Sequence, residues 1–156
     1  MANVPSEEVR FNEADLAPVE ATMASVASDG SGWINFLPAL DDGTRVPPRS
    51  TLFAIFTARG PAVPMATWKP GSETPATRPV FGIEHGSGPQ ALARLREHDL
   101  ALPAGWLKVA DHPKRGLVLT APAGTADGEI LWWLLTACHI LSTVPLSGDW
   151  LARVYG

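Results

Sequence analysis

The sequence predicts a single domain of mixed α+β type, and three observations support this prediction. The chain has 156 residues, of which 46% are hydrophobic and 18% charged, as in ordinary globular domains. Apolar runs at helical spacing occur together with short apolar runs typical of strands. Two proline-rich loops, 38–50 and 69–79, separate these runs, and no charged linker is long enough to separate the two halves of the chain. We therefore expect one cooperative unit over residues 1–156.

The N-terminal half contains one predicted helix followed by extended runs. Apolar residues recur at helical spacing over 16–28, and Gly30 ends this helix. Three predicted strands follow, at 33–37, 51–57 and 62–68. The central run is apolar on both faces, which places it inside a covered sheet.

The C-terminal half predicts alternating strands and helices in the order β-α-β-β-α-β. The predicted elements are strand 80–84, helix 88–98, strands 106–110 and 117–121, helix 128–143 and strand 150–155. This order is the signature of the ferredoxin-like arrangement, here with an N-terminal helix and additional antiparallel strands. It predicts that 117–121 pairs antiparallel with both 80–84 and 106–110, in the strand order 4-1-3-2.

The start of the helix 88–98 carries a glycine-containing motif. Ser87 is placed to cap the helix, and Gln90, three positions later, completes a capping box. The stretch from Gly86 to Ala91 spells G-x-G-x-x-A and resembles a dinucleotide-binding fingerprint, with Asp111 where a ribose-binding acid is expected. It is also similar to the pyrophosphate loop of the acyl-CoA N-acetyltransferases. The order of the later elements differs from both families, so a capped helix start is the favoured interpretation.

The predicted topology gathers three loops, 84–88, 111–115 and 144–149, at one edge of the sheet. Their polar residues are His85, Ser87, His112, Lys114, Arg115, Ser147 and Asp149. Together with the amides of a helix N-terminus, these side chains suit a small anion, and we predict an anion-binding site formed by His85, Ser87, His112, Lys114 and Arg115. Arg115 is the expected principal contact, because its guanidinium binds carboxylate or phosphate with two hydrogen bonds. The alternative is an ordinary polar loop end of a sheet.

The helix 128–143 is apolar on nearly every side. Its polar exceptions, Thr136, His139 and Thr143, align with Trp132 on one stripe. Trp132 and Trp133 lie about 100° apart around the helix axis, so both are hard to bury within one chain. We therefore predict self-association, as a homodimer, with Trp132 and Trp133 at the interface.

Charge and motif content exclude several classes of protein. The net charge of −4 and the absence of a concentrated basic patch argue against nucleic-acid binding. The longest apolar stretch is too short to span a membrane, and the first ten residues do not predict a signal peptide, so we expect a cytoplasmic protein. We find no local metal-binding motif and expect no cofactor, and Cys138 is interpreted as core.

Two functions remain open from the sequence. The first, which we favour, is a non-enzymatic binding or regulatory module that self-associates. The second is a small enzyme or ligand-binding protein that recognises a phosphorylated or carboxylated small molecule at the loops 84–88, 111–115 and 144–149, with His85 or His112 as general acid or base. A deep cavity lined by His85, His112 and Arg115 would favour the second, and a flat apolar patch would favour the first.

Overall fold

The computed structural model describes residues 4–40, 62–73 and 75–156, and the predicted strand 51–57 lies outside the described residues. The elements in chain order are β1 (Glu7–Asn12), α1 (Ala17–Asp29), β2 (Trp33–Leu40), β3 (Met65–Lys69), β4 (Ser72–Glu73), β5 (Ala76–Thr77), β6 (Val80–Glu84), α3 (Ala91–Glu97), β7 (Leu107–His112), β8 (Gly116–Thr120), α4 (Asp127–Leu141) and β9 (Leu146–Tyr155). The described elements are thus a mixture of helices and strands, and the predicted α+β class is confirmed.

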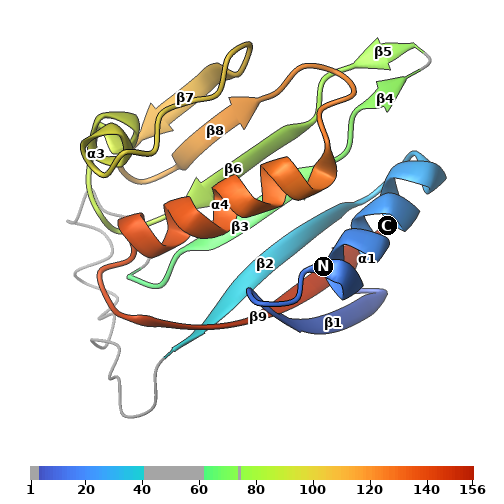
Figure 1. Ribbon diagram of the computed structural model, residues 1–156, viewed down its shortest axis with the longest axis horizontal. Coiled ribbons are helices and arrows are strands. Elements are labelled where there is room, and N and C mark those ends of the chain that lie inside the picture. The colour runs from blue at the N-terminus through green and yellow to red at the C-terminus, as the bar shows by residue number, and fades with distance from the viewer. Residues whose placement is uncertain (1–3, 41–61, 74) are drawn as a thin grey trace.

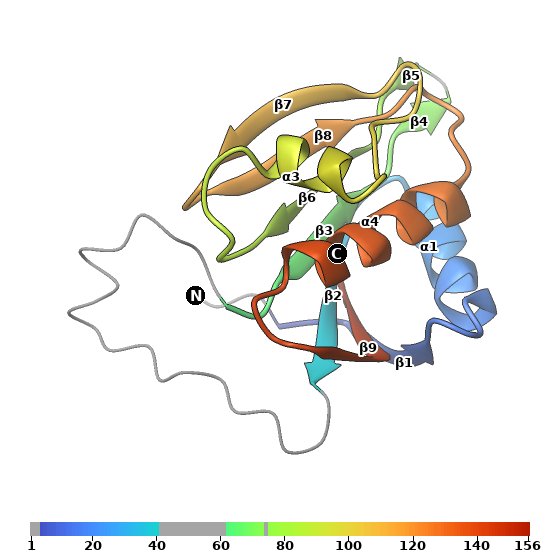
Figure 2. The ribbon, with the colours of Figure 1, turned by 60° about the vertical axis from the view of Figure 1, so that its left-hand side comes forward.

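Seven of the strands form one antiparallel sheet in the order β1-β9-β2-β3-β6-β8-β7. The short strands β4 and β5 form a separate hairpin. Figures 1 and 2 show α1, α3 and α4 on the same face of the large sheet. Helix α4 contacts β3 and β6 at the centre of the sheet, α1 packs beside β1, and α3 packs beside β7. The described chain therefore has two layers.

Side chains that face the helices form the core, because successive residues of a strand point to opposite faces. Phe36, Trp68, Phe81 and Leu119 are at most 2% exposed and lie on the helix-covered face. The alternate residues of these strands and of β9 are only partly buried, among them Trp33, Thr67, Val118, Leu151 and Tyr155. In the described part of the chain, no helix covers this second face. We call it the open face.

Helix α4 is buried on most of its circumference. Ile130, Leu131, Leu134 and Ala137 are fully buried, whereas Trp132 is 57% exposed. Trp132 of the polar stripe predicted from the sequence therefore faces outward, whereas His139 contacts Glu13, and Thr143 lies beyond the end of the helix. Within the described residues, no helix is long and apolar enough to cross a membrane.

The predicted strand order is only partly right. Strand β8 pairs antiparallel with both β6 and β7, as predicted. Strand β9, however, lies between β1 and β2, and the β2–β3 pair separates it from β6. The ten-residue β9 pairs with the eight-residue β2 along most of its length, which satisfies more backbone groups than the five-residue β6 offers. The ferredoxin-like order 4-1-3-2 is therefore not confirmed.

Candidate functional site

Two of the three predicted loops lie next to each other, and the third does not. The end of β6 is adjacent to the β7–β8 turn, since Ile83 pairs with Leu117 and Leu117 pairs with Asp111. The predicted loop 144–149 is mostly the first part of β9, which begins at Leu146 and lies three strand positions away from β6. At about 4.8 Å per strand, that separation is about 14 Å. The inserted β2–β3 pair thus separates Ser147 and Asp149 from the other predicted site residues.

His85 is a buried residue bound to its neighbour Ser87. Its Nδ1 lies 2.8 Å from the Ser87 hydroxyl and accepts the Ser87 backbone N–H at 3.3 Å. The side chain is 1% exposed, and its Nε2 has no hydrogen-bond partner among the described residues. Burial lowers the pKa of His85, Asp111 raises it and Arg94 lowers it further. The net effect favours a neutral imidazole that does not reach the surface.

The N-terminus of α3 is capped by a distant carboxylate. The two oxygens of Asp111 accept the backbone N–H groups of Ala91 and Leu92, at 3.0 and 3.1 Å. Gln90 has a φ of 60° and makes no side-chain cap, so the predicted capping box does not form. The charged Asp111 side chain accepts both amides at once, which Ser87 cannot do. The helix amides expected to bind an external anion therefore already have an acceptor within the chain.

The β7–β8 turn is organised by His112. Its Nδ1 accepts the backbone N–H groups of Lys114 and Arg115, both at 3.1 Å. The side chains of Lys114 and Arg115 are exposed. Of the five predicted anion-binding residues, Arg115 lines a hollow on the surface of the described residues.

This hollow is a groove of about 400 Å³ on the open face, centred on β6 and its two neighbouring strands. Its volume lies within the range of small-molecule sites in proteins. The side chains that give the groove its chemical character are Trp33, Thr67, Lys69, Val80, Glu84, Arg115 and Val118. The groove therefore combines apolar walls with a few charged groups.

The floor of the groove exists because Gly82 has no side chain. Gly82 pairs with Thr67 of β3 on one side and with Val118 of β8 on the other. A Cβ atom on Gly82 would lie 2.4 Å from the carbonyl oxygen of Leu117, which excludes any larger residue there. A glycine in the interior of a strand marks such close approaches. Gly82 inside a predicted strand is therefore a sequence signal for the groove, although it was not among the predicted site residues.

Charged side chains lie at both ends of the groove. Lys69 pairs with Val80 at one end of β6, whereas Glu84 lies at the other end, next to Arg115. In the described residues, none of these three groups forms an ion pair within 4.0 Å. No other described residue therefore neutralises these three charges.

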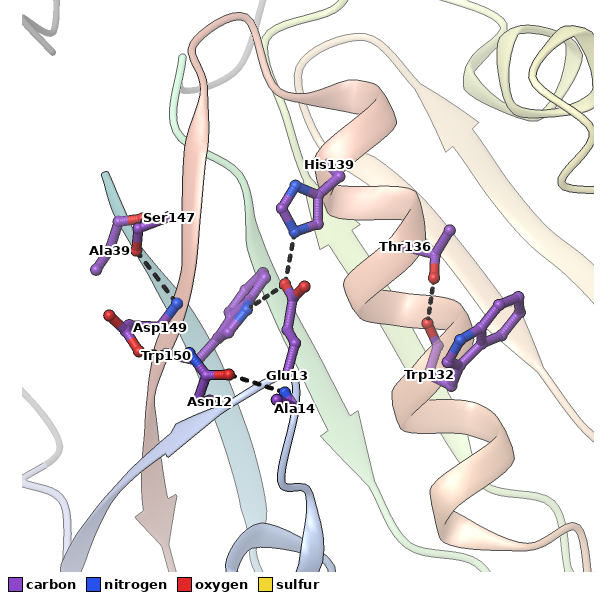
Figure 3. Close-up of polar contacts among 10 residues, drawn as sticks. All are labelled: Asn12, Glu13, Ala14, Ala39, Trp132, Thr136, His139, Ser147, Asp149 and Trp150. Carbon is purple, nitrogen blue, oxygen red and sulfur yellow. Dashed lines mark hydrogen bonds and ion pairs between the residues drawn. The ribbon is translucent and has the colours of Figure 1, made fainter. Parts of the chain in front are cut away.

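A second polar cluster joins three elements on the helix side of the sheet (Figure 3). One carboxylate oxygen of Glu13 accepts the indole N–H of Trp150 at 2.7 Å and lies 2.5 Å from Nε2 of His139. Asn12 donates to Asp149 at 2.7 Å beside it. Because the cluster connects the β1–α1 segment, α4 and β9, its evident role is to fix these elements relative to one another. The sequence gives no hint of it, since Glu13 is more than one hundred positions from both His139 and Trp150.

The two adjacent tryptophans of α4 have different environments. Trp133 is 2% exposed, donates its indole N–H to the carbonyl of Ala101 at 3.2 Å and packs against Trp106. Trp132 points away from the sheet, next to Thr136 (Figure 3). Of the two tryptophans predicted at an interface, Trp132 is therefore exposed on α4, whereas Trp133 belongs to the core.

The described residues contain no cluster of three or more His, Cys, Asp or Glu side chains that could hold a metal ion. Cys138 is fully buried, and desolvation raises the pKa of its thiol, so it is unreactive core. No protein-family model, curated protein or solved structure matches this chain.

Proposed function

We propose that this chain is a binding module that holds a small molecule with an apolar body in the groove on its open face. The observation that carries the proposal is the groove itself, with its bare floor at Gly82, apolar walls from Val80, Val118 and Trp33, and charges at its ends that form no ion pair with another described residue. Sites for small molecules are typically concave and mostly apolar, with a few polar groups that orient the ligand.

The rigidity of the groove favours binding. Strands β3, β6 and β8 are hydrogen-bonded to one another across it. Trp33 is stacked on Tyr155 with ring centroids 5.2 Å apart and an interplanar angle of 11°. Thr67 donates its hydroxyl to Asn35 at 2.8 Å. A ligand therefore does not have to order these groups, which reduces the entropic cost of binding.

The size of the apolar contribution shows that the charged groups are also needed. The apolar body of a phenyl-sized ligand has a surface of roughly 200 Å². If the groove buries about half of this surface, apolar contact contributes about 2.5 kcal/mol to binding. Association costs at least about 4 kcal/mol in lost translation and rotation. Apolar contact alone therefore gives no useful affinity, and the ligand must also engage a charge at the end of the groove.

The proposal is tested by filling the groove. Val118→Phe places a ring over Gly82, and Val109→Phe is the matched control, because Val109 lies on β7, is 61% exposed and does not line the groove. We expect benzyl- and indole-bearing probes with a charged head to raise the melting temperature of the wild type and of Val109→Phe, but not of Val118→Phe. Equal stabilisation of all three proteins, or of none, would remove the support for the groove as a binding site.

Self-association is a second candidate property, favoured by Trp132. A tryptophan that is 57% exposed on an otherwise polar helix stripe is typical of contact surfaces. We propose that a second copy of the chain covers it. Sedimentation of the wild type and of Trp132→Gln over a range of concentrations tests this. A concentration-dependent dimer that the substitution weakens supports the interface, and a monomeric wild type contradicts it.

A further inference from the structure

We infer that the ligand of the groove is a free α-amino acid with a bulky apolar side chain, an inference that rests on the proposed function above. The observation behind it is that two opposite charges, Glu84 and Arg115, line the same end of the groove without neutralising each other.

The backbone brings Glu84 and Arg115 together. Glu84 is the last residue of β6, and Arg115 directly precedes the first residue of β8, Gly116. Gly116 lies so close to β6 that a Cβ on it would be 3.2 Å from the Cα of Glu84. Although both side chains are exposed, no ion pair within 4.0 Å joins them in the described part of the chain. Each charged head is therefore free to bind a ligand group of opposite charge.

A zwitterion fits this pair better than a simple ion. The Arg115 guanidinium can bind the α-carboxylate through two parallel hydrogen bonds, and the Glu84 carboxylate can accept from the α-ammonium. A ligand with only a negative head would be repelled by Glu84, and one with only a positive head would be repelled by Arg115. Selection thus comes from repulsion as well as attraction.

The rest of the groove sets the nature of the side chain. From Glu84 the floor runs along β6 past Gly82 to Val80, five residues whose four steps span about 13 Å. Val118 flanks this path, and Trp33 lines the same groove. A side chain such as that of phenylalanine, leucine or tryptophan lies along this floor, whereas a short or charged side chain leaves the apolar walls unfilled.

Three probes that share one phenyl body test the inference on the full chain: L-phenylalanine, 3-phenylpropionate, which lacks the ammonium, and 2-phenylethylamine, which lacks the carboxylate. Titration followed by NMR gives the dissociation constant of each. We expect L-phenylalanine to bind about tenfold more tightly than either analogue, as one charge-assisted hydrogen-bonded contact is added.

Two substitutions assign the contacts. Arg115→Gln is expected to weaken the binding of the two probes that carry a carboxylate, L-phenylalanine and 3-phenylpropionate, but not that of 2-phenylethylamine. Glu84→Gln is expected to weaken the binding of the two probes that carry an ammonium, L-phenylalanine and 2-phenylethylamine, but not that of 3-phenylpropionate. The matched controls are Arg96→Gln and Glu7→Gln, both exposed and outside the groove. We expect them to leave all three constants unchanged.

The outcomes separate the two proposals. If the three probes bind equally well and Val118→Phe abolishes their binding, the amino-acid inference is overturned while the groove remains a binding site. If no probe with an apolar body binds, both proposals are overturned. If L-phenylalanine binds most tightly and the two Gln variants show the crossed pattern, the inference is confirmed.

Discussion

The carboxylate of Asp111 has two effects at the end of β7. It caps α3 through the N–H groups of Ala91 and Leu92, and its charge raises the pKa of the buried His85. Sequence reasoning assigned the cap to Ser87, three positions before the motif's Gln90, because capping signals are read locally. A cap that comes from a residue about twenty positions away leaves no local pattern.

Asp111→Asn tests this cap. The amide side chain keeps one acceptor oxygen, but it loses the charge and the second acceptor, so we expect the free energy of unfolding to fall by about 1 kcal/mol. Urea unfolding measures the change. Asp29→Asn is the control, since Asp29 is exposed and has no hydrogen-bonded side chain among the described residues. An Asp111→Asn protein as stable as this control would contradict the cap.

His85 makes stability depend on pH in a defined direction. Its pKa is lowered in the folded protein, chiefly by burial, so below the ordinary value of 6.5 the unfolded chain binds a proton that the folded chain does not. Stability is therefore full above pH 6.5 and falls as the pH drops through the interval between 6.5 and the lower folded-state pKa. His85→Asn keeps an acceptor for Ser87 but does not titrate. Urea unfolding gives the free energy of unfolding at pH 7.5 and at pH 5.5. We expect it to fall less between these pH values in His85→Asn than in the wild type, and an equal fall in both proteins would refute the assignment.

At the scale of elements, local patterns predicted both long helices and most strands of the sheet, but they missed β1, began β9 four residues too late and predicted the pairing less well. Strand β6 matches its predicted bounds, and α1 and α4 lie within about two residues of theirs. Hydrophobic periodicity reports which side of an element is buried, and that information is local. The pairing partner of β9 depends on the relative lengths of β2 and β6 and on hydrogen bonds between strands that are far apart in the chain. The sequence carries no local signal for such pairing.

Asp127 at the start of α4 and Glu20 of α1 form a repulsive pair. Desolvation, followed by the nearby charge of Glu20, raises the pKa of Asp127. A raised carboxyl pKa means that the ionised form is disfavoured in the folded state. Stability therefore decreases as the pH rises from the ordinary pKa of an aspartate towards the raised pKa of Asp127 in the folded protein. Glu20→Gln removes the charge and is expected to raise the free energy of unfolding at pH 7 by up to about 0.5 kcal/mol. A decrease in stability would show that Glu20 has an attractive role instead.

At the scale of the whole molecule, the last strand ties the two halves together. The neighbours of β9 are β1 and β2, both from the N-terminal half. A fragment that begins at Pro79 therefore lacks both partners of its longest strand. We expect this fragment to show no cooperative thermal transition and the full chain to show a single one in calorimetry. A folded fragment, or two resolved transitions in the full chain, would contradict this.

The sequence located part of the candidate site. Arg115 was expected to bind a small anion, and it lines the groove, whereas His85 is enclosed in the core and Ser147 lies across the inserted strands. The groove depends on Gly82 and on side chains from four different strands. Since it arises from strand order and register, neither of which is local, residues such as Trp33 and Lys69 could not be assigned to it in advance.

The central claim is that the open face, at the groove over Gly82, is the binding surface of this protein. Mapping amide chemical-shift changes on the full chain during titration with L-phenylalanine tests it most directly. The account predicts that the shifted residues concentrate in 67–69, 80–84 and 115–118, which surround the groove. Shifts that cluster instead on the outer stripe of α4 around Trp132, or around the Glu13–His139 pair, would contradict it.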